Sequence, residues 1–226
     1  MQDALEPALA QIAGAPIGVT AAGRTDRGVH ATAQVVHFDA PAQRPASAWV
    51  RGANALLPGS VAVLWSKEMP PEFHARYSAV SRTYRYRLLN RPVRPALEAP
   101  YVGWFHSPLD LDSMRAAARL LVGEHDFSAF RSSECQAKTP VRTLHALEVE
   151  KQGERIDFVL RANAFLHHMV RNIVGTLVYV GKGKHPPQWA REVLDSRNRA
   201  KAAPTFGPQG LVLERVEYEA RWGLPA

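Results

Sequence analysis

A short segment at residues 23–30 holds the side chains with the clearest chemical potential. Asp26 lies in it between Arg24 and Arg27, and two glycines bracket the carboxylate. Glycine permits backbone turns that other residues resist, and neighbouring cations favour the ionised form of a carboxylate. An ionised and positioned carboxylate can serve as a nucleophile or a general base. The alternative is an ordinary polar turn held by an aspartate side chain, and the segment alone leaves both interpretations open.

Metal-binding patterns are weak in this sequence. His167 and His168 are adjacent within an expected helix, where successive side chains point about 100° apart. The only cysteine is Cys135, and no His-Glu-x-x-His pattern occurs. We therefore expect no metal site, and we interpret Cys135 as an ordinary thiol. A lone cysteine also excludes a disulfide within the chain and fits a cytoplasmic protein.

The elements that must position these residues alternate between helical and strand patterns, which predicts a mixed α/β fold. A Pro-rich stretch at 92–108 is the best candidate for a junction between two halves, at 1–105 and 106–226. The periodicities predict helices at 2–13, 46–57, 111–122, 165–180 and 188–195, and strands at 17–22, 35–38, 61–65, 84–89, 144–151, 155–162 and 211–218. Gly123 is the expected end of the third helix.

The charge balance favours an anionic partner. Lys and Arg total 28 against 21 Asp and Glu, which gives a formal net charge of +7. Nucleic acid is the first candidate for such a basic chain and an anionic membrane is the second, while a solvated basic surface is the alternative to both. No apolar run approaches the roughly 20 residues that span a bilayer, so we expect no membrane association.

Several segments resemble one family. The segment GRTDRGVHA at 23–31 resembles the active-site motif of the tRNA pseudouridine synthase A family, and QVVHF at 34–38 continues it. Further segments resemble that family in the same order: FHARYSA at 73–79, RTYRY at 82–86, DFSAFR at 126–131 and AFLHHMVRNIVG at 164–175. One octapeptide alone is moderate evidence, whereas an ordered series over nearly the whole chain is strong.

The resemblance implies a role for each matched residue. Asp26 would be the catalytic nucleophile, and Arg171 would pair with it. Tyr84 would pack against the target base, Arg24 would assist base flipping, and Arg76 would contact tRNA. Taken without the resemblance, Tyr84 fits an ordinary strand tyrosine, although the arginines that alternate with it are compatible with an RNA-facing sheet.

The resemblance also implies the fold, the reaction and the partners. The fold would have two related halves, whose mixed or antiparallel sheets join into one surface with a central RNA-binding cleft and with helices on the opposite face. The enzyme would be a homodimer that isomerises uridine at positions 38–40 of the tRNA anticodon stem-loop. This reaction needs no redox step and no group donor, so no cofactor is implied.

The sequence departs from the family at its start. The family begins with a strand and a Tyr-Asp-Gly segment, which have no counterpart before the helix at 2–13. We expect the first strand of the sheet to be missing, with lower stability and impaired catalysis as the consequence. A tRNA-binding fragment without turnover is therefore the alternative function. Arg27 is a smaller departure, since the family often has a small residue there.

Overall fold

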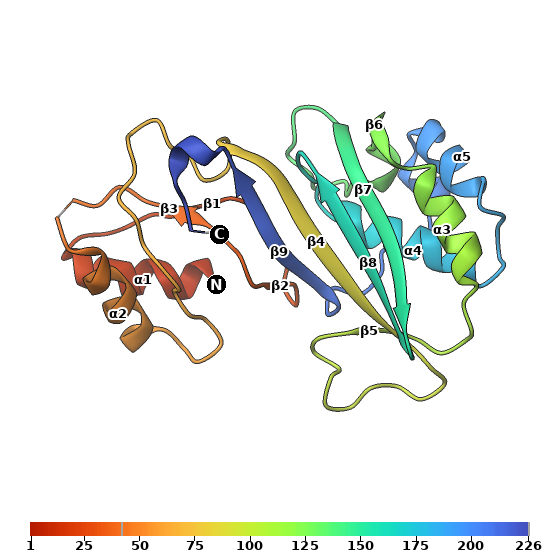
Figure 1. The fold of residues 1–226 in the computed structure, drawn as a ribbon, viewed down its shortest axis with the longest axis horizontal. Helices are drawn as coiled ribbons and strands as arrows, with labels where there is room; N and C mark the ends of the chain where they lie inside the picture. Colours follow the sequence, from red (N-terminus) through yellow and green to blue (C-terminus); the bar gives the residue numbers. More distant parts are fainter. Residues whose placement is uncertain (42, 226) are drawn as a thin grey trace. The chain divides into compact units, whose positions relative to one another are not determined.

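The structure is a computed structural model that describes residues 1–41 and 43–225. Its contacts divide the chain into two compact units. The first unit comprises Met1–Arg24, Val35–Ala79 and the chain from Tyr218 onward, and the second comprises Thr25–Gln34 and Val80–Glu217 (Figure 1). Each unit combines helices and strands, which confirms the mixed α/β architecture.

The first unit is built around two packed helices. Helix α1 spans Gln2–Ala13 and helix α2 spans Ala46–Leu56, close to their expected bounds. Their apolar faces enclose a small core of buried side chains, comprising Leu5, Leu9, Ala13, Ile17, Val19, Trp49 and Ala53. The strands expected at 17–22 and 35–38 form only a short antiparallel pair, β1 (Thr20–Ala21) with β3 (Val36–His37).

The strand expected at 61–65 is wrong, because those residues have no strand conformation. The side-chain amide of Asn54 takes the place of a strand partner there. Its Nδ2 donates to the carbonyl of Val63 at 2.8 Å, and its Oδ1 accepts from the amide of Val63 at 2.7 Å. A backbone that is satisfied by a side chain in this way needs no sheet neighbour.

The second unit contains a seven-stranded mixed sheet with the order β2-β9-β4-β8-β7-β6, and β5 pairs with β4. The strands are β2 (His30–Ala31), β4 (Ala79–Asn90), β5 (Gly103–Phe105), β6 (Gly123–Asp126), β7 (Val141–Gln152), β8 (Arg155–Ala162) and β9 (Leu211–Tyr218). Strand β9 and the β7–β8 hairpin match the sequence expectation, and Gly153 turns the hairpin with a φ of 60°. The short strands β5 and β6 were not expected.

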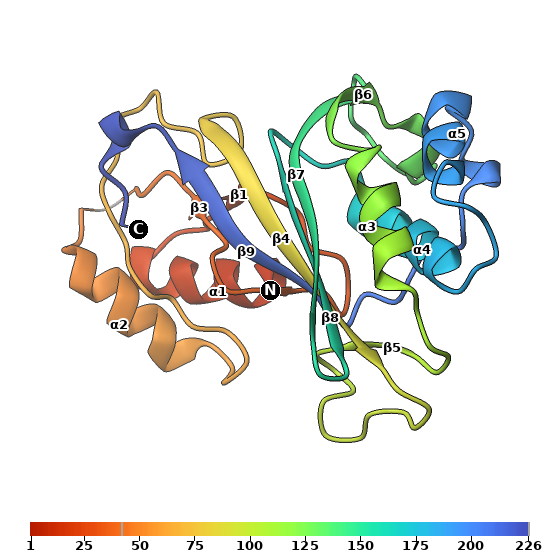
Figure 2. The same ribbon diagram turned by 45° about the vertical axis from the view of Figure 1, so that its right-hand side comes forward.

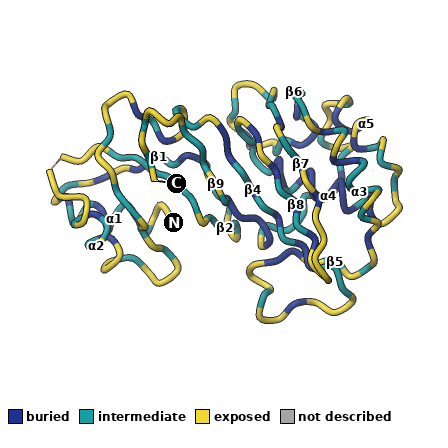
Figure 3. Tube along the Cα trace, in the orientation of Figure 1, coloured by how far each residue is buried: buried dark blue, intermediate teal, exposed yellow. Residues whose placement is uncertain are grey.

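Three helices lie on one side of this sheet (Figure 2). They are α3 (Leu111–Arg119), α4 (Met169–Gly181) and α5 (Trp189–Ser196), and α3 contacts β7 and both other helices. The largest fully buried side chains of the unit come from both layers and include Tyr86, Leu88, Phe158, Leu160, Met114, Met169 and Ile173. Burial therefore concentrates along β4, β8 and α4 (Figure 3). Two 3-10 turns complete this layer, η1 (Ser128–Phe130) and η2 (Arg199–Lys201).

Two helix ends differ from expectation for local reasons. Helix α3 ends at Arg119, and Gly123 is the first residue of β6 rather than a helix cap. Helix α4 begins at Met169 rather than at 165, because His168 has the left-handed φ of 63° and interrupts any helix that would run through it. The second change decides where the histidine pair points.

The Pro-rich stretch at 92–108 lies inside the second unit. The two units are defined by contacts, and contacts do not test whether residues 1–105 and 106–226 are structurally related halves. That division of the chain therefore stays a prediction. Within the described residues, no helix is both long enough and apolar enough to cross a membrane.

Candidate active site

The loop that carries Asp26 is anchored to the sheet of the second unit. It continues into β2, which pairs in parallel with the start of β9 through His30 opposite Val212. The amide of Val29 donates to the carbonyl of Asp26 at 3.0 Å and closes a turn. Gly28 allows this turn, since its φ is 83° and a Cβ there would lie only 3.1 Å from Pro208 Cγ.

The Asp26 carboxylate meets three side chains from the segment at the start of α4. Its Oδ2 lies 2.9 Å from Arg171 Nη1 and 3.1 Å from His168 Nε2, and its Oδ1 lies 3.0 Å from His167 Nε2. The carboxylate is 23% exposed. Both of its oxygens thus have partners, and part of the carboxylate still faces solvent.

Arg171 is fixed by a second set of hydrogen bonds. Its Nε donates to the carbonyl of Phe206 at 2.8 Å, and the amide of Phe206 donates to the carbonyl of Arg171 at 3.2 Å. The Arg171 side chain is only 13% exposed. A cation this buried needs an anionic partner, and Asp26 supplies it. The structure therefore brings together the two residues that the resemblance pairs.

The two histidines were missed as partners of Asp26. Our expectation that they point apart rested on a helix through residues 165–180, and it is wrong because α4 starts after them. Their rings lie 4.0 Å apart between centroids and both reach Asp26. Asp26, His167 and His168 offer ligand atoms within 4.8 Å of one another, a set that could hold a metal ion. The absence of a metal therefore stays a prediction.

The backbone around the histidines is tied to a neighbouring loop. The amide of Ser132 donates to the carbonyl of His167 at 3.0 Å, and the amide of His167 donates to Cys135 Sγ at 3.4 Å. Burial, followed by the charge of His167, lowers the pKa of His168 although Asp26 acts in the opposite direction. A neutral imidazole is therefore favoured at position 168 at neutral pH.

Tyr84 lies on β4 and faces the core. It is 8% exposed, and its ring packs edge-on against Phe165 with centroids 5.0 Å apart. Burial raises the pKa of Tyr84 to about 12, Arg82 opposes that shift and the charge of Asp26 adds to it. The phenol is therefore neutral at physiological pH, and the negative charge of Asp26 contributes to raising its pKa.

The arginine that follows Tyr84 points to the other face of the sheet. Arg85 pairs with Asp157 of β8 at 2.9 Å and with Glu214 of β9 at 2.8 Å. Its charge is therefore compensated within the sheet. The alternation of tyrosine and arginine along β4 separates a core face from an ion-paired face.

Two other candidates, Arg24 and Arg76, belong to the first unit and are exposed. The guanidinium of Arg76 lies 5.7 Å from the ring centroid of Tyr77, which is itself 77% exposed. Asp26, by contrast, belongs to the second unit. Their roles stay predictions. Arg27, to which no role was assigned, is exposed on the Asp26 loop.

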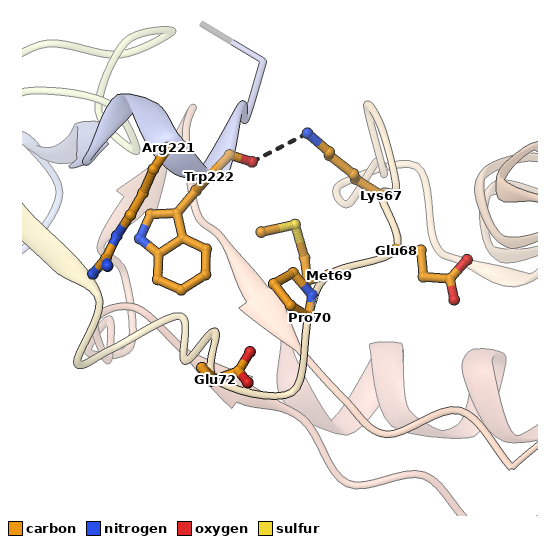
Figure 4. Close-up of a pocket in the computed structure, with 7 residues that line it drawn as sticks. All are labelled: Lys67, Glu68, Met69, Pro70, Glu72, Arg221 and Trp222. Atoms are coloured by element: carbon orange, nitrogen blue, oxygen red, sulfur yellow. Dashed lines mark hydrogen bonds between the residues drawn. The ribbon is translucent and has the colours of Figure 1, made fainter.

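The first unit also has a surface pocket of its own (Figure 4). It is lined by Lys67, Glu68, Met69, Pro70, Glu72, Arg221 and Trp222. Lys67 Nζ donates to the carbonyl of Trp222 at 3.1 Å across one side. Charges of both signs stand around it, and none of the candidate catalytic residues lines it.

Comparison with known proteins points to one family. A family model described as tRNA pseudouridine synthase matches residues 117–219, the part that contains Arg171. A protein from Dechloromonas aromatica named tRNA pseudouridine synthase A is 57% identical over 225 residues, which cover 100% of this chain and 86% of the relative. Proteins of the same name from Nitrosomonas europaea and Burkholderia thailandensis are 56% and 57% identical over 225 residues, with 83% of each relative covered. The expectation of a missing first strand stays a prediction. Identity at this level over the whole chain shows that it belongs to the tRNA pseudouridine synthase family.

Proposed function

We propose that this chain is an isomerase that converts uridine to pseudouridine at positions 38–40 of the tRNA anticodon stem-loop, with Asp26 as the nucleophile. The observation that carries the proposal is the carboxylate of Asp26, which is paired with Arg171 at 2.9 Å and remains 23% exposed. The names of the relatives favour a synthase over a tRNA-binding fragment without turnover.

The reaction requires only a carboxylate and proton transfers. The C1′–N1 glycosidic bond of uridine breaks, the uracil rotates, and a C1′–C5 bond forms. C5 then loses its proton and N1 gains one, so that product and substrate have the same composition. Asp26 would attack either C1′ of the ribose, as N1 leaves, or C6 of the uracil. The bond to Asp26 breaks again, by displacement at C1′ when C5 attacks or by elimination from C6, so the carboxylate is regenerated. No electron donor or group donor takes part, so no cofactor is proposed.

The Asp26 environment fits this use of a carboxylate. Arg171 fixes Oδ2 and carries the opposite charge, while Oδ1 has one partner among the described residues, His167. Release of that one hydrogen bond would free a lone pair on Oδ1 for attack. A positioned carboxylate also avoids the entropic cost of bringing a nucleophile to the base.

The target base must leave the helical stack before Asp26 can reach it, at a cost of a few kcal/mol. Arg24 is proposed to fill the vacated space, Tyr84 to pack against the flipped uracil, and Arg76 to contact the tRNA. Base–aromatic contacts contribute about 1–3 kcal/mol per base, which is enough to offset much of the unstacking. A homodimer in the cytoplasm is proposed from the family resemblance, and light scattering of the purified chain tests the dimer.

The decisive experiment replaces Asp26 with Asn, which keeps the shape and removes the nucleophile. We expect Asp26→Asn to lower the rate of pseudouridine formation in a full-length tRNA by at least about 1000-fold. Its tRNA affinity should stay within a few-fold of the parent. The matched control is Asp195→Asn, since that carboxylate is 57% exposed on α5 and pairs with Arg191 of the same helix.

The outcomes separate the possible functions. Retained turnover in Asp26→Asn would remove the nucleophile assignment. Tight, salt-sensitive tRNA binding by the parent chain without any modified nucleoside would favour the binding fragment instead. Activity in the parent and in Asp195→Asn, with none in Asp26→Asn, supports the proposal.

A further inference from the structure

A second pocket, in the second unit, adjoins the Asp26 cluster and is rich in cations and hydroxyl groups. Its volume is about 650 Å³, and its lining residues are Ser128, Arg131, Ser132, Ser133, His168, Arg197, Asn198, Arg199 and Thr205. No carboxylate is among these lining residues of the described chain. Guanidinium and hydroxyl donors that converge on one hollow are the groups that bind phosphate oxygens.

Arg199 is the clearest sign that an anion belongs there. Its Nη2 donates to Asn172 Oδ1 at 3.1 Å and to Thr205 Oγ1 at 3.0 Å, and both of these partners are neutral. Burial lowers the pKa of the Arg199 guanidinium from its ordinary value. In the described part of the chain it forms no ion pair within 4.0 Å. A partly desolvated cation without a counter-ion gains from an incoming anion.

The pocket keeps a positive balance after the neighbouring acids are counted. Asp126 lies 3.5 Å from Arg197 Nε. Burial would raise the pKa of Asp126, but hydrogen bonds from Ser128 and the charges of Arg197 and Arg131 outweigh it and leave that pKa lowered. Asp26 and Glu134 also act on His168 at the edge of the pocket, and the charge of Asp26 is opposed by Arg171 at 2.9 Å. The guanidinium groups of Arg131, Arg197 and Arg199 therefore still outnumber the remaining carboxylates, Asp126 and Glu134.

The position of the pocket decides which anion is meant. His168 lines it, and the same imidazole lies 3.1 Å from Asp26 Oδ2. A nucleotide whose base and sugar reach Asp26 has its backbone close to this histidine if its strand runs toward the pocket. Its flanking phosphodiester is the anion with the right charge and the right proximity.

We propose that the pocket lined by Arg131, Arg197 and Arg199 binds a backbone phosphodiester of the RNA strand next to the target uridine. The inference rests on the proposed function, because it places the backbone relative to Asp26. The pocket would hold the flipped nucleotide by its phosphate while leaving the base and C1′ at the carboxylate.

The test uses variants that remove charge from the pocket. Arg197→Asn suits a residue whose φ is the left-handed 49°, since Asn tolerates that conformation. Arg199→Gln keeps an amide donor toward Thr205. We expect each to weaken tRNA binding several-fold, and to reduce the slope of log Kd against log salt concentration by about 0.7–0.9 for the lost phosphate contact. The control is Arg191→Gln, a 47% exposed residue of α5 outside the pocket.

Neutral phosphate analogues then identify the group that is bound. A full-length tRNA is assembled by ligation with a methylphosphonate on the 5′ or the 3′ side of the target uridine. One of these should weaken binding to the parent chain yet add little to the loss in Arg197→Asn. The phosphate site is overturned if the methylphosphonate and Arg197→Asn weaken binding independently on both sides of the uridine. It is also overturned if Arg197→Asn and Arg199→Gln show the same dependence of log Kd on log salt concentration as Arg191→Gln. Absence of pseudouridine formation by the parent chain would instead overturn the proposed function.

Discussion

The pairing of Arg171 with Asp26 allows a quantitative test of how the site is held. Consider Arg171→Met, which keeps the length and apolar stem of the side chain and removes its charge. Removing one partner of a fully buried ion pair costs about 3–5 kcal/mol, because the other charge stays buried without compensation. Here the two side chains are 13% and 23% exposed, so water relieves part of that cost.

We therefore expect Arg171→Met to lower the free energy of unfolding by about 2–3 kcal/mol. About 1 kcal/mol of it comes from the lost hydrogen bond to the carbonyl of Phe206, which joins Nε to oxygen at 2.8 Å. Asp26→Asn should cost less, since the amide still accepts from the guanidinium. In the double variant no charged carboxylate is stranded, so its loss should be smaller than the sum of the single losses by about 1–2 kcal/mol.

The assay is urea denaturation followed by far-ultraviolet circular dichroism and by tryptophan fluorescence, with coincident transitions required for a two-state free energy. Arg171→Lys serves as the control, since it keeps the charge but lacks the donor to Phe206, and it should lose about half as much as Arg171→Met. The reasoning would be refuted if the loss of unfolding free energy in the double variant equalled the sum of the two single losses to within about 0.5 kcal/mol, because independent residues behave in that way.

Further expectations concern the Asp26 loop, His168 and metals. Gly28→Ala should lower the free energy of unfolding by about 2–3 kcal/mol, because the new methyl group would crowd Pro208 at a residue whose φ is the left-handed 83°. Gly153→Ala should lower it by only about 1 kcal/mol, because the φ of 60° is left-handed but the space around Gly153 is open. Equal losses in urea denaturation would contradict this difference. The pKa of His168 is lowered mainly by burial, so the unfolded chain takes up the proton more readily. Stability from this group is then complete above the unfolded pKa of about 6.5 and declines as pH falls toward the lower folded pKa. His168→Gln should therefore lose less unfolding free energy than the parent between about pH 7.5 and pH 5.5, and a parallel loss would exclude the effect. Dialysis against EDTA should leave pseudouridine formation unchanged, and a loss that zinc restores would make Asp26 part of a metal site.

Periodicity predicted the elements that pack by an amphipathic face, and it failed where side chains replace backbone partners. Helices α1 and α2 and strand β9 follow from their apolar spacing. Asn54 satisfies both backbone groups of Val63, so an apolar alternation there forms no strand. Whether a side chain satisfies the backbone in this way depends on which residue lies nearby in space, and the sequence carries no periodic signal for it.

The site divides in the same way. The family resemblance paired Asp26 with Arg171, and the structure places them 2.9 Å apart. The two histidines were missed because their direction depends on the φ of 63° at His168. The apolar pattern of residues 165–180 predicts a continuous helix and gives no sign of a left-handed residue within it. The pocket proposed to bind phosphate joins residues 128–133 to residues 197–205, and contacts of η1 with α5 and with η2 bring these segments together.

The reciprocal hydrogen bonds between Arg171 and Phe206 determine when the Arg171 side chain loses its conformational entropy, on folding or on RNA binding. The Arg171 side chain has several rotatable bonds, and fixing them costs conformational entropy of up to about 2 kcal/mol. Since Nε is already committed to the carbonyl of Phe206, that cost is met when the protein folds. For the proposed reaction, the Asp26 carboxylate is preorganised before the RNA arrives, so binding energy from the tRNA remains available to unstack the target base.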